Sequence, residues 1–145
     1  MFKEASRSQV FFNKKIEVRT SSLHGLGIFA TESIEKHECI ESAPVVLFHQ
    51  DTMHELRKNN IRNETHILHD YVFGWERQQV AIGLGYASLY NHANHDANVS
   101  YRMLCNEPGR IEFIAKRKIE AGEELLVHYR LGRGAVQFDI SGGKI

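Results

Sequence analysis

The chain has 145 residues, with 18 Lys and Arg balanced by 18 Asp and Glu, and 42% of its residues are hydrophobic. This length fits one domain, and this share of apolar residues excludes a wholly disordered chain. The balanced charge gives no support to a protein that binds nucleic acid directly by neutralising phosphates.

The apolar pattern excludes further classes. The longest apolar stretches, such as residues 44–48, are far too short to span a bilayer, and residues 1–15 lack a signal-peptide core. We therefore expect an intracellular protein with no membrane contact, cytoplasmic, or nuclear if the source is eukaryotic. Cys39 and Cys105 lack CxxC partners, so we expect two buried or free thiols and no cysteine-based zinc site.

Short strands separated by turns dominate the predicted elements. In chain order, strands are expected at residues 10–19, 28–30, 38–41, 45–48, 66–75, 80–82, 100–104, 111–115 and 125–129. One short helix is expected over residues 51–59, with Asp51 as its N-cap. The Gly-rich residues 131–145 are expected to form a flexible tail. This pattern is typical of a mostly-β domain.

Three segments carry residues that are suited to binding or chemistry. In Gly25-Leu26-Gly27, two glycines let the backbone bend and approach a ligand closely, although a plain turn explains the same pattern. Residues 91–98 hold three Asn, two His and an Asp, which suit an adenine edge, a knotted backbone or an Asx-rich turn. Residues 119–129 end a predicted strand in Tyr129, and a lone tyrosine in such a place is usually structural.

In order and spacing, these three segments resemble the SET-domain family of protein methyltransferases. Residues 24–30 look like its cofactor loop, residues 89–92 look like its Asn-His motif, and residues 122–129 look like its closing motif. The resemblance covers about residues 15–130. Asn98 stands one place later than the family's second Asn, and His128 stands where an Asp is common. The family's Cys-rich zinc segments are absent, as in its small stand-alone bacterial and viral members.

The resemblance implies a fold and an activity. The fold is a SET-type β-clip of small curved sheets, with a pseudoknot where residues 91–92 and 125–129 cross. The whole chain, 1–145, would be one SET domain with a short helical insert at about residues 49–66. The activity is methyl transfer from S-adenosylmethionine to the ε-amine of a protein lysine. The implied partner is a protein or peptide that presents a lysine, and a second copy of the chain is a candidate to cover the site.

The resemblance also implies roles for single residues. Tyr129 would be catalytic, and no residue would bind a metal. Tyr71, Tyr86 and Tyr90 would line the lysine channel, with packing in the core as the alternative reading. The residues expected to bind the cofactor are Gly25, Leu26, Gly27, Asn91, His92 and, by stacking on adenine, Phe138.

Three other functions compete with this one. A metal-dependent hydrolase is the main alternative, because residues 66–70 and 92–96 both read His-x-x-His-Asp. A SET-fold binding module without activity is the second, and a nucleophile formed by Cys39 or Cys105 with a histidine is the third. Metal content after purification and calorimetric titration with S-adenosylmethionine separate these classes.

Overall fold

The computed structural model describes residues 11–59, 71–105 and 108–129, which form ten strands, one α-helix and one 3-10 turn. The helical elements are α2 (Gln50–Lys58) and η1 (Ala87–Leu89). The strands are β1 (Phe11–Phe12), β2 (Ile16–Thr20), β3 (Leu26–Ala30), β4 (Cys39–His49), β5 (Val72–Gly74), β6 (Gln79–Gly83), β7 (Asn91–His92), β8 (Val99–Leu104), β9 (Arg110–Ala115) and β10 (Glu124–Val127). This confirms the predicted mostly-β class.

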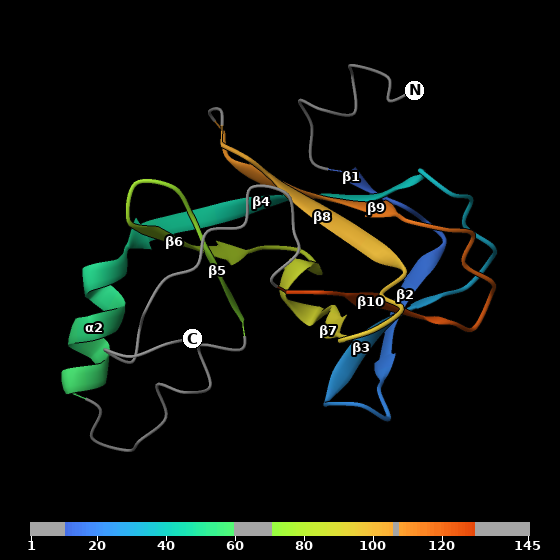
Figure 1. Ribbon diagram of the computed structural model, residues 1–145, viewed down its shortest axis with the longest axis horizontal. Coiled ribbons are helices and arrows are strands. Elements are labelled where there is room, and N and C mark those ends of the chain that lie inside the picture. The colour runs from blue at the N-terminus through green and yellow to red at the C-terminus, as the bar shows by residue number, and fades with distance from the viewer. Residues whose placement is uncertain (1–10, 60–70, 106–107, 130–145) are drawn as a thin grey trace.

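The strands join in the order β2-β3-β10-β8-β9-β4-β6-β5, with β1 added to β4 and β7 added to β10. In Figure 1, β2 and β3 lie at one end of the molecule, and α2 lies at the other end beside β4 and β6. Within the described residues, the helices are too short and polar to cross a bilayer.

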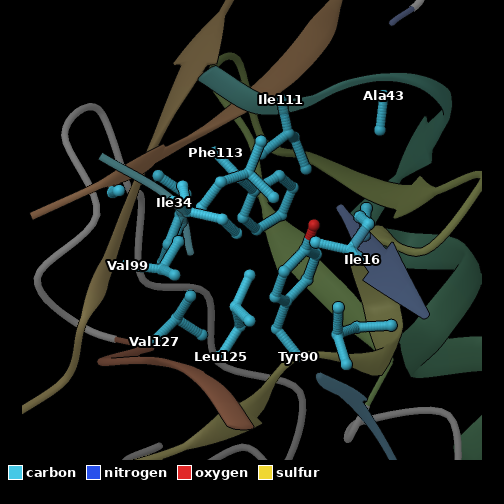
Figure 2. Close-up of a cluster of buried hydrophobic side chains, with 14 of the residues drawn as sticks. Ile16, Ile34, Ala43, Tyr90, Val99, Ile111, Phe113, Leu125 and Val127 are labelled. Carbon is cyan, nitrogen blue, oxygen red and sulfur yellow. The ribbon is translucent and has the colours of Figure 1, made fainter. Parts of the chain in front are cut away.

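A single large cluster of apolar side chains lies between the curled strands. Its members occupy every second position along β9 and β10, as the two-residue period of a strand requires. The alternate positions of β10 are partly exposed, whereas on β9 they include the buried Arg110 and Glu112. Figure 2 shows Ile111, Phe113, Leu125 and Val127 converging on the ring of Tyr90. This core holds together the strands that carry the three motifs.

The first predicted strand, residues 10–19, is interrupted. A turn separates β1 from β2, because Asn13 accepts a hydrogen bond from the Lys15 amide at 3.0 Å and donates its side-chain amide to the Cys39 carbonyl at 3.1 Å. These are the local backbone bonds that make Asn a turn residue. The apolar pattern cannot show such an interruption, so the prediction of one strand is corrected here.

The opposite correction applies to β4, which was expected as two strands. Pro44 lies inside one continuous strand, at the point where β4 changes partner from β9 to β6. A proline has no N–H to donate, and a change of partner is a place where a strand tolerates this loss. The Pro44 carbonyl still accepts a hydrogen bond from the Leu84 amide at 2.9 Å.

The expected helix is present, but its N-cap differs. The side chain of His49, two residues before the predicted cap, accepts the Asp51 amide at 3.2 Å, and Asp51 lies in the first turn. Part of the predicted insert, residues 60–66, lies outside the described residues.

The strand crossing next to the predicted motifs is the feature that positions the site. Residues 91–92, at the start of the Asn- and His-rich segment, form β7 and pair in parallel with β10. β10 also pairs in parallel with β8 and antiparallel with β3. The cofactor-loop, Asn-His and closing motifs therefore meet around β10, as a SET-type fold requires.

Candidate active site

A cavity of about 490 Å³ opens where the loop before β3 meets β7 and the end of β10. Its lining combines apolar, amide and imidazole groups from five separate segments. The lining residues that the structure describes are Leu23, His24, Gly25, Leu26, Tyr71, Ser88, Leu89, Asn91, His92 and Tyr129. None of these is Lys, Arg, Asp or Glu, so the described wall holds no carboxylate or fixed positive charge.

The two glycines of the loop serve different purposes. Gly25 has a positive φ of 47°, a conformation that L side chains rarely adopt, and its carbonyl accepts the Ser21 amide at 2.8 Å. Gly27 instead leaves room for a neighbouring side chain, because an added Cβ would lie 2.2 Å from Oε1 of Glu124 and would displace that carboxylate. Gly25 thus lies in the turn before β3, whereas Leu26 and Gly27 are the first two residues of β3.

Asn91 connects this loop to β7. Its side-chain amide nitrogen lies 3.1 Å from the His24 carbonyl, 3.1 Å from the Leu26 carbonyl and 2.8 Å from Oε1 of Glu124. The residue is only 6% exposed. A buried amide with three acceptors fixes the loop, so part of the role of Asn91 is to shape the cavity wall.

His92 is held in one tautomer by its neighbours. The backbone N–H of Tyr129 lies 3.1 Å from Nδ1 of His92, and a backbone N–H can only donate. Nδ1 is therefore the acceptor, so the ring proton is on Nε2, which lies 2.7 Å from Oδ1 of Asn94. Both ring nitrogens are used, and the ring centroid lies 4.9 Å from that of Tyr129.

Tyr129 is anchored at three points on the cavity wall. Its N–H binds His92, its hydroxyl donates to the Tyr90 carbonyl at 2.9 Å, and its carbonyl accepts the hydroxyl of Tyr101. The residue is still 42% exposed. The buried Tyr101 was not singled out from the sequence, because nothing local shows that its hydroxyl reaches a residue 28 positions away.

The structure separates the three tyrosines that were expected to line the lysine channel. Tyr71 lies on the cavity wall with Tyr129. The ring of Tyr90 instead enters the core, where it stacks on Phe113 at 4.2 Å between centroids (Figure 2). Tyr86 packs edge-on against Phe12 and is not among the described lining residues. We therefore correct the prediction for the Tyr90 ring, and only its backbone carbonyl reaches Tyr129.

Asn98 is a further residue whose role was missed. Its amide donates to the Glu124 carbonyl at 2.9 Å, and its carbonyl oxygen accepts the Leu126 amide at 2.8 Å. The side chain thus takes the place of a strand neighbour for β10. The displaced second Asn of the motif was the available signal for this contact.

Two of the competing functions, the cysteine nucleophile and the metal-dependent hydrolase, receive no support from the described residues. Burial raises the pKa of the Cys39 thiol to about 12, and burial also raises the pKa of Cys105, so neither is prepared as a thiolate nucleophile. Both cysteines are free thiols, as predicted. No group of three or more potential metal ligands occurs in the described part of the chain, and residues 66–70 lie outside it.

The cavity fits the expected methyl donor. Its volume lies within the roughly 300–1,000 Å³ typical of small-ligand sites. The glycine turn and the polar side chains offer hydrogen-bonding groups to a nucleoside and an amino-acid end, and the described wall holds no Lys or Arg that would repel a sulfonium. The fold and this cavity are those expected for the SET-type methyltransferase that the sequence predicts.

Comparison with known proteins leads to the same class. The family model described as SET domain matches residues 25–130. The chain is 30% identical over 114 residues to "Histone-lysine N-methyltransferase, H3 lysine-37 specific" of Schizosaccharomyces pombe, covering 79% of the chain and 72% of that protein. It is 30% identical over 123 residues to "Histone-lysine N-methyltransferase MEDEA" of Arabidopsis thaliana, covering 83% of the chain and 17% of that protein.

Solved structures agree. A Plasmodium falciparum protein described as a histone methyltransferase matches with a TM-score of 0.64 and 28% identity, over 83% of this chain and 97% of that chain. Polycomb Repressive Complex 2 from Chaetomium thermophilum, bound to S-adenosylmethionine, matches with a TM-score of 0.65 and 28% identity, over 81% of this chain and 15% of that chain. The chain belongs to the SET-domain family of protein lysine methyltransferases, whose methyl donor is S-adenosylmethionine.

Proposed function

We propose that this chain transfers a methyl group from S-adenosylmethionine to the ε-amine of a lysine in a protein substrate. The observation that carries the proposal is the position of Tyr129, which three hydrogen bonds fix on the wall of a cavity that the glycine loop also lines. The SET-domain match and the named activity of the relatives support the same reaction.

The cofactor would be held by the loop and by β7. When bound, S-adenosylmethionine supplies an electrophilic methyl group on a positively charged sulfur. Gly25, Leu26 and Gly27 offer backbone groups, and Asn91 and His92 border the same cavity. Phe138, the expected adenine contact, lies outside the described residues and stays a prediction.

The cavity wall favours the neutral form of the incoming amine. Lysine ordinarily titrates near ~10.4, so its deprotonation at pH 7 costs about 4–5 kcal/mol. Removal from water disfavours the ammonium form, and no described lining residue is a carboxylate that would stabilise it. The lysine is therefore expected to lose its proton to solvent as it enters.

Tyr129 can orient that amine. Its hydroxyl hydrogen is donated to the Tyr90 carbonyl, so its oxygen has lone pairs with which to accept from an amine N–H. This interaction turns the nitrogen lone pair toward the methyl group, and such alignment can supply several kcal/mol of a barrier. Weak C–H···O contacts to the same oxygen add a second-order effect.

Incubation of the full chain with methyl-labelled S-adenosylmethionine, a histone mixture and whole-cell lysate tests the proposal. Mass spectrometry is expected to find the label on lysine side chains. Cofactor binding by calorimetry without any labelled lysine would instead indicate a binding module. Label on other residue types would contradict the substrate class.

The identity of the target belongs to the same proposal. Histone tails are the first substrates to test, because the named relatives are histone-lysine methyltransferases. We further propose an intracellular setting and a second copy of the chain as a cover for the site. Light scattering of the purified chain with and without cofactor tests the second copy.

A further inference from the structure

Glu124, the first residue of β10, lies where three segments of the chain meet. Its Oε2 accepts the hydroxyl of Ser21 at 2.9 Å, and its Oε1 accepts the side-chain amide of Asn91 at 2.8 Å. Its backbone carbonyl accepts the side-chain amide of Asn98 at 2.9 Å. One residue thus connects the turn after β2, strand β7 and the start of β8.

The carboxylate also lies directly against the glycine loop. A Cβ placed on Gly27 would be 2.2 Å from Oε1 of Glu124 and 3.0 Å from the amide nitrogen of Asn91. A side chain at residue 27 would therefore displace the carboxylate of Glu124 from its present position. The backbone at Gly27 and the carboxylate of Glu124 are therefore packed directly against each other.

Asn91 shows why a charged acceptor matters here. Its amide nitrogen has two hydrogens but lies within hydrogen-bond distance of three oxygens, those of Glu124, His24 and Leu26. The bond to the carboxylate is the shortest, and hydrogen bonds to charged groups are about twice as strong as neutral ones. The carboxylate therefore sets the rotation of the amide, and the amide then holds the two loop carbonyls.

We propose that Glu124 is a positioning residue for the cofactor loop. It fixes Ser21 and Asn91, and through them it presents residues 24–27 to S-adenosylmethionine. The inference rests on the proposed function of the cavity. Glu124 is not among the described lining residues, and we assign it no contact with the reacting atoms.

Two substitutions test this role in the full chain. Glu124→Ala is expected to raise the Kd and the KM for S-adenosylmethionine about tenfold, because two hydrogen bonds to a charged group are lost. The KM for a lysine peptide should stay unchanged. In Glu124→Gln, the Kd and KM for S-adenosylmethionine should stay within about threefold of the values of the unsubstituted chain. The glutamine oxygen can still accept from Asn91, and its amide can donate to Ser21.

The neighbouring glutamate provides a matched control. The carboxylate of Glu123 accepts the Glu120 amide at 2.6 Å and pairs with Arg117 at 3.2 Å. Glu123→Ala removes the same charge and also loses hydrogen bonds, so it should lower Tm. It should leave the Kd for S-adenosylmethionine unchanged. An equal loss of affinity in both alanine variants would overturn the inference, since a general loss of stability would then explain it.

Hydrogen exchange separates this inference from the proposed function. Without cofactor, Glu124→Ala should speed amide exchange in residues 21–27 about tenfold, and Glu123→Ala should not. If the unsubstituted chain binds no S-adenosylmethionine, the proposed function fails, while the exchange comparison still decides the role of Glu124. Unchanged exchange and unchanged affinity in Glu124→Ala would remove that role. If that variant does not fold, Ser21→Ala removes the hydroxyl that donates to Glu124 and that also accepts the Leu23 amide at 3.0 Å, and it should raise the Kd about threefold; an unchanged Kd would remove the role of Glu124.

Discussion

At the scale of single residues, the hydroxyl of Tyr129 has the most specific assignment. Tyr129→Phe removes the oxygen that would orient the amine, while the His92 and Tyr101 contacts to its backbone remain. We expect kcat to fall at least about tenfold, equivalent to 1.36 kcal/mol of barrier. The Kd for S-adenosylmethionine should not change.

Steady-state kinetics and calorimetry check this expectation. Tyr86→Phe is the matched control, because it removes the same atom from a ring that packs on Phe12 and is not part of the described cavity wall. Equal kcat values in Tyr129→Phe and in the unsubstituted chain would exclude the catalytic role of the hydroxyl.

His92 offers a second prediction, about geometry. Because its Nδ1 accepts the Tyr129 amide, an asparagine oxygen can occupy nearly the same place. His92→Asn is therefore expected to keep most of the methyl-transfer rate, whereas His92→Ala leaves that amide without its acceptor and should lower kcat/KM about tenfold. Rates of the two variants, measured side by side, check this. An equal loss of kcat/KM in His92→Asn and His92→Ala would show that the imidazole ring itself is required.

At the scale of elements, the hairpin between β5 and β6 is conformationally costly. Arg77 and Gln78 have positive φ values of 56° and 58°, and the Gln79 amide donates to the Glu76 carbonyl at 3.2 Å. This is a type I′ turn, in which Asn-Gly is the favoured pair. The turn also supports α2, because the Gln78 carbonyl accepts the Gln50 amide at 2.8 Å.

Replacing the turn residues should stabilise the protein. The double substitution Arg77→Asn with Gln78→Gly relieves the left-handed strain and keeps the backbone bond to α2, so unfolding should cost about 1–2 kcal/mol more. Urea denaturation measures the change. Glu120→Gly, at an exposed position without positive φ, should destabilise the fold instead. A turn variant that is no more stable than the original would contradict the strain argument.

At the scale of the whole molecule, one buried carboxyl group makes the stability of the fold depend on pH. Glu41 is fully buried, and it accepts the Tyr86 amide at 2.9 Å and the Tyr90 hydroxyl at 2.8 Å. Burial raises the pKa of Glu41 to about 7, although both hydrogen bonds favour the ionised form. The folded state therefore binds a proton more tightly than the unfolded chain.

The sign of the effect follows from this difference. The contribution of Glu41 to stability is fully present below about pH 4.5, falls as the pH rises, and is lost above about pH 7. Glu41→Gln carries no ionisable group at this position. Between pH 5 and pH 8, its free energy of unfolding should therefore rise by on the order of 2–3 kcal/mol relative to that of the unsubstituted chain. Urea unfolding at both pH values checks this. If the free energy of unfolding changed with pH equally in Glu41→Gln and in the unsubstituted chain, the raised pKa of Glu41 would be contradicted.

Glu38 provides a control of opposite sign. Burial alone would raise its pKa, but hydrogen bonds from Asn13, the Glu35 amide and Lys15, with the charge of Lys15, together hold the pKa below its ordinary value. Its contribution to stability is present above about pH 4.5 and is lost as the pH falls. Glu38→Gln should therefore be destabilising at pH 8 and nearly neutral in acid.

Local chemistry and side-chain alternation were enough to predict much of this protein. The strand class, the short helix, the free thiols and the SET-type motifs depend on residues close together in the chain. A two-residue hydrophobic period, a glycine pair or an Asn-His pair can be recognised in the sequence without knowing which distant segments pack against it. For the same reason the closing motif could be predicted to end in Tyr129, although the last strand ends two residues earlier, at Val127. The role of Tyr129 as the catalytic hydroxyl is a proposal.

Tertiary structure decided which groups meet. Ser21 and Glu124 are 103 positions apart, so no local pattern shows that they share a hydrogen bond. The ring of Tyr90 enters the core because Glu41 and Phe113 receive it, and Pro44 stays within a strand because the pairing partner changes beside it. Hydrogen bonds and ring contacts between distant segments exist only once the strands have crossed, since folding alone brings those partners within reach.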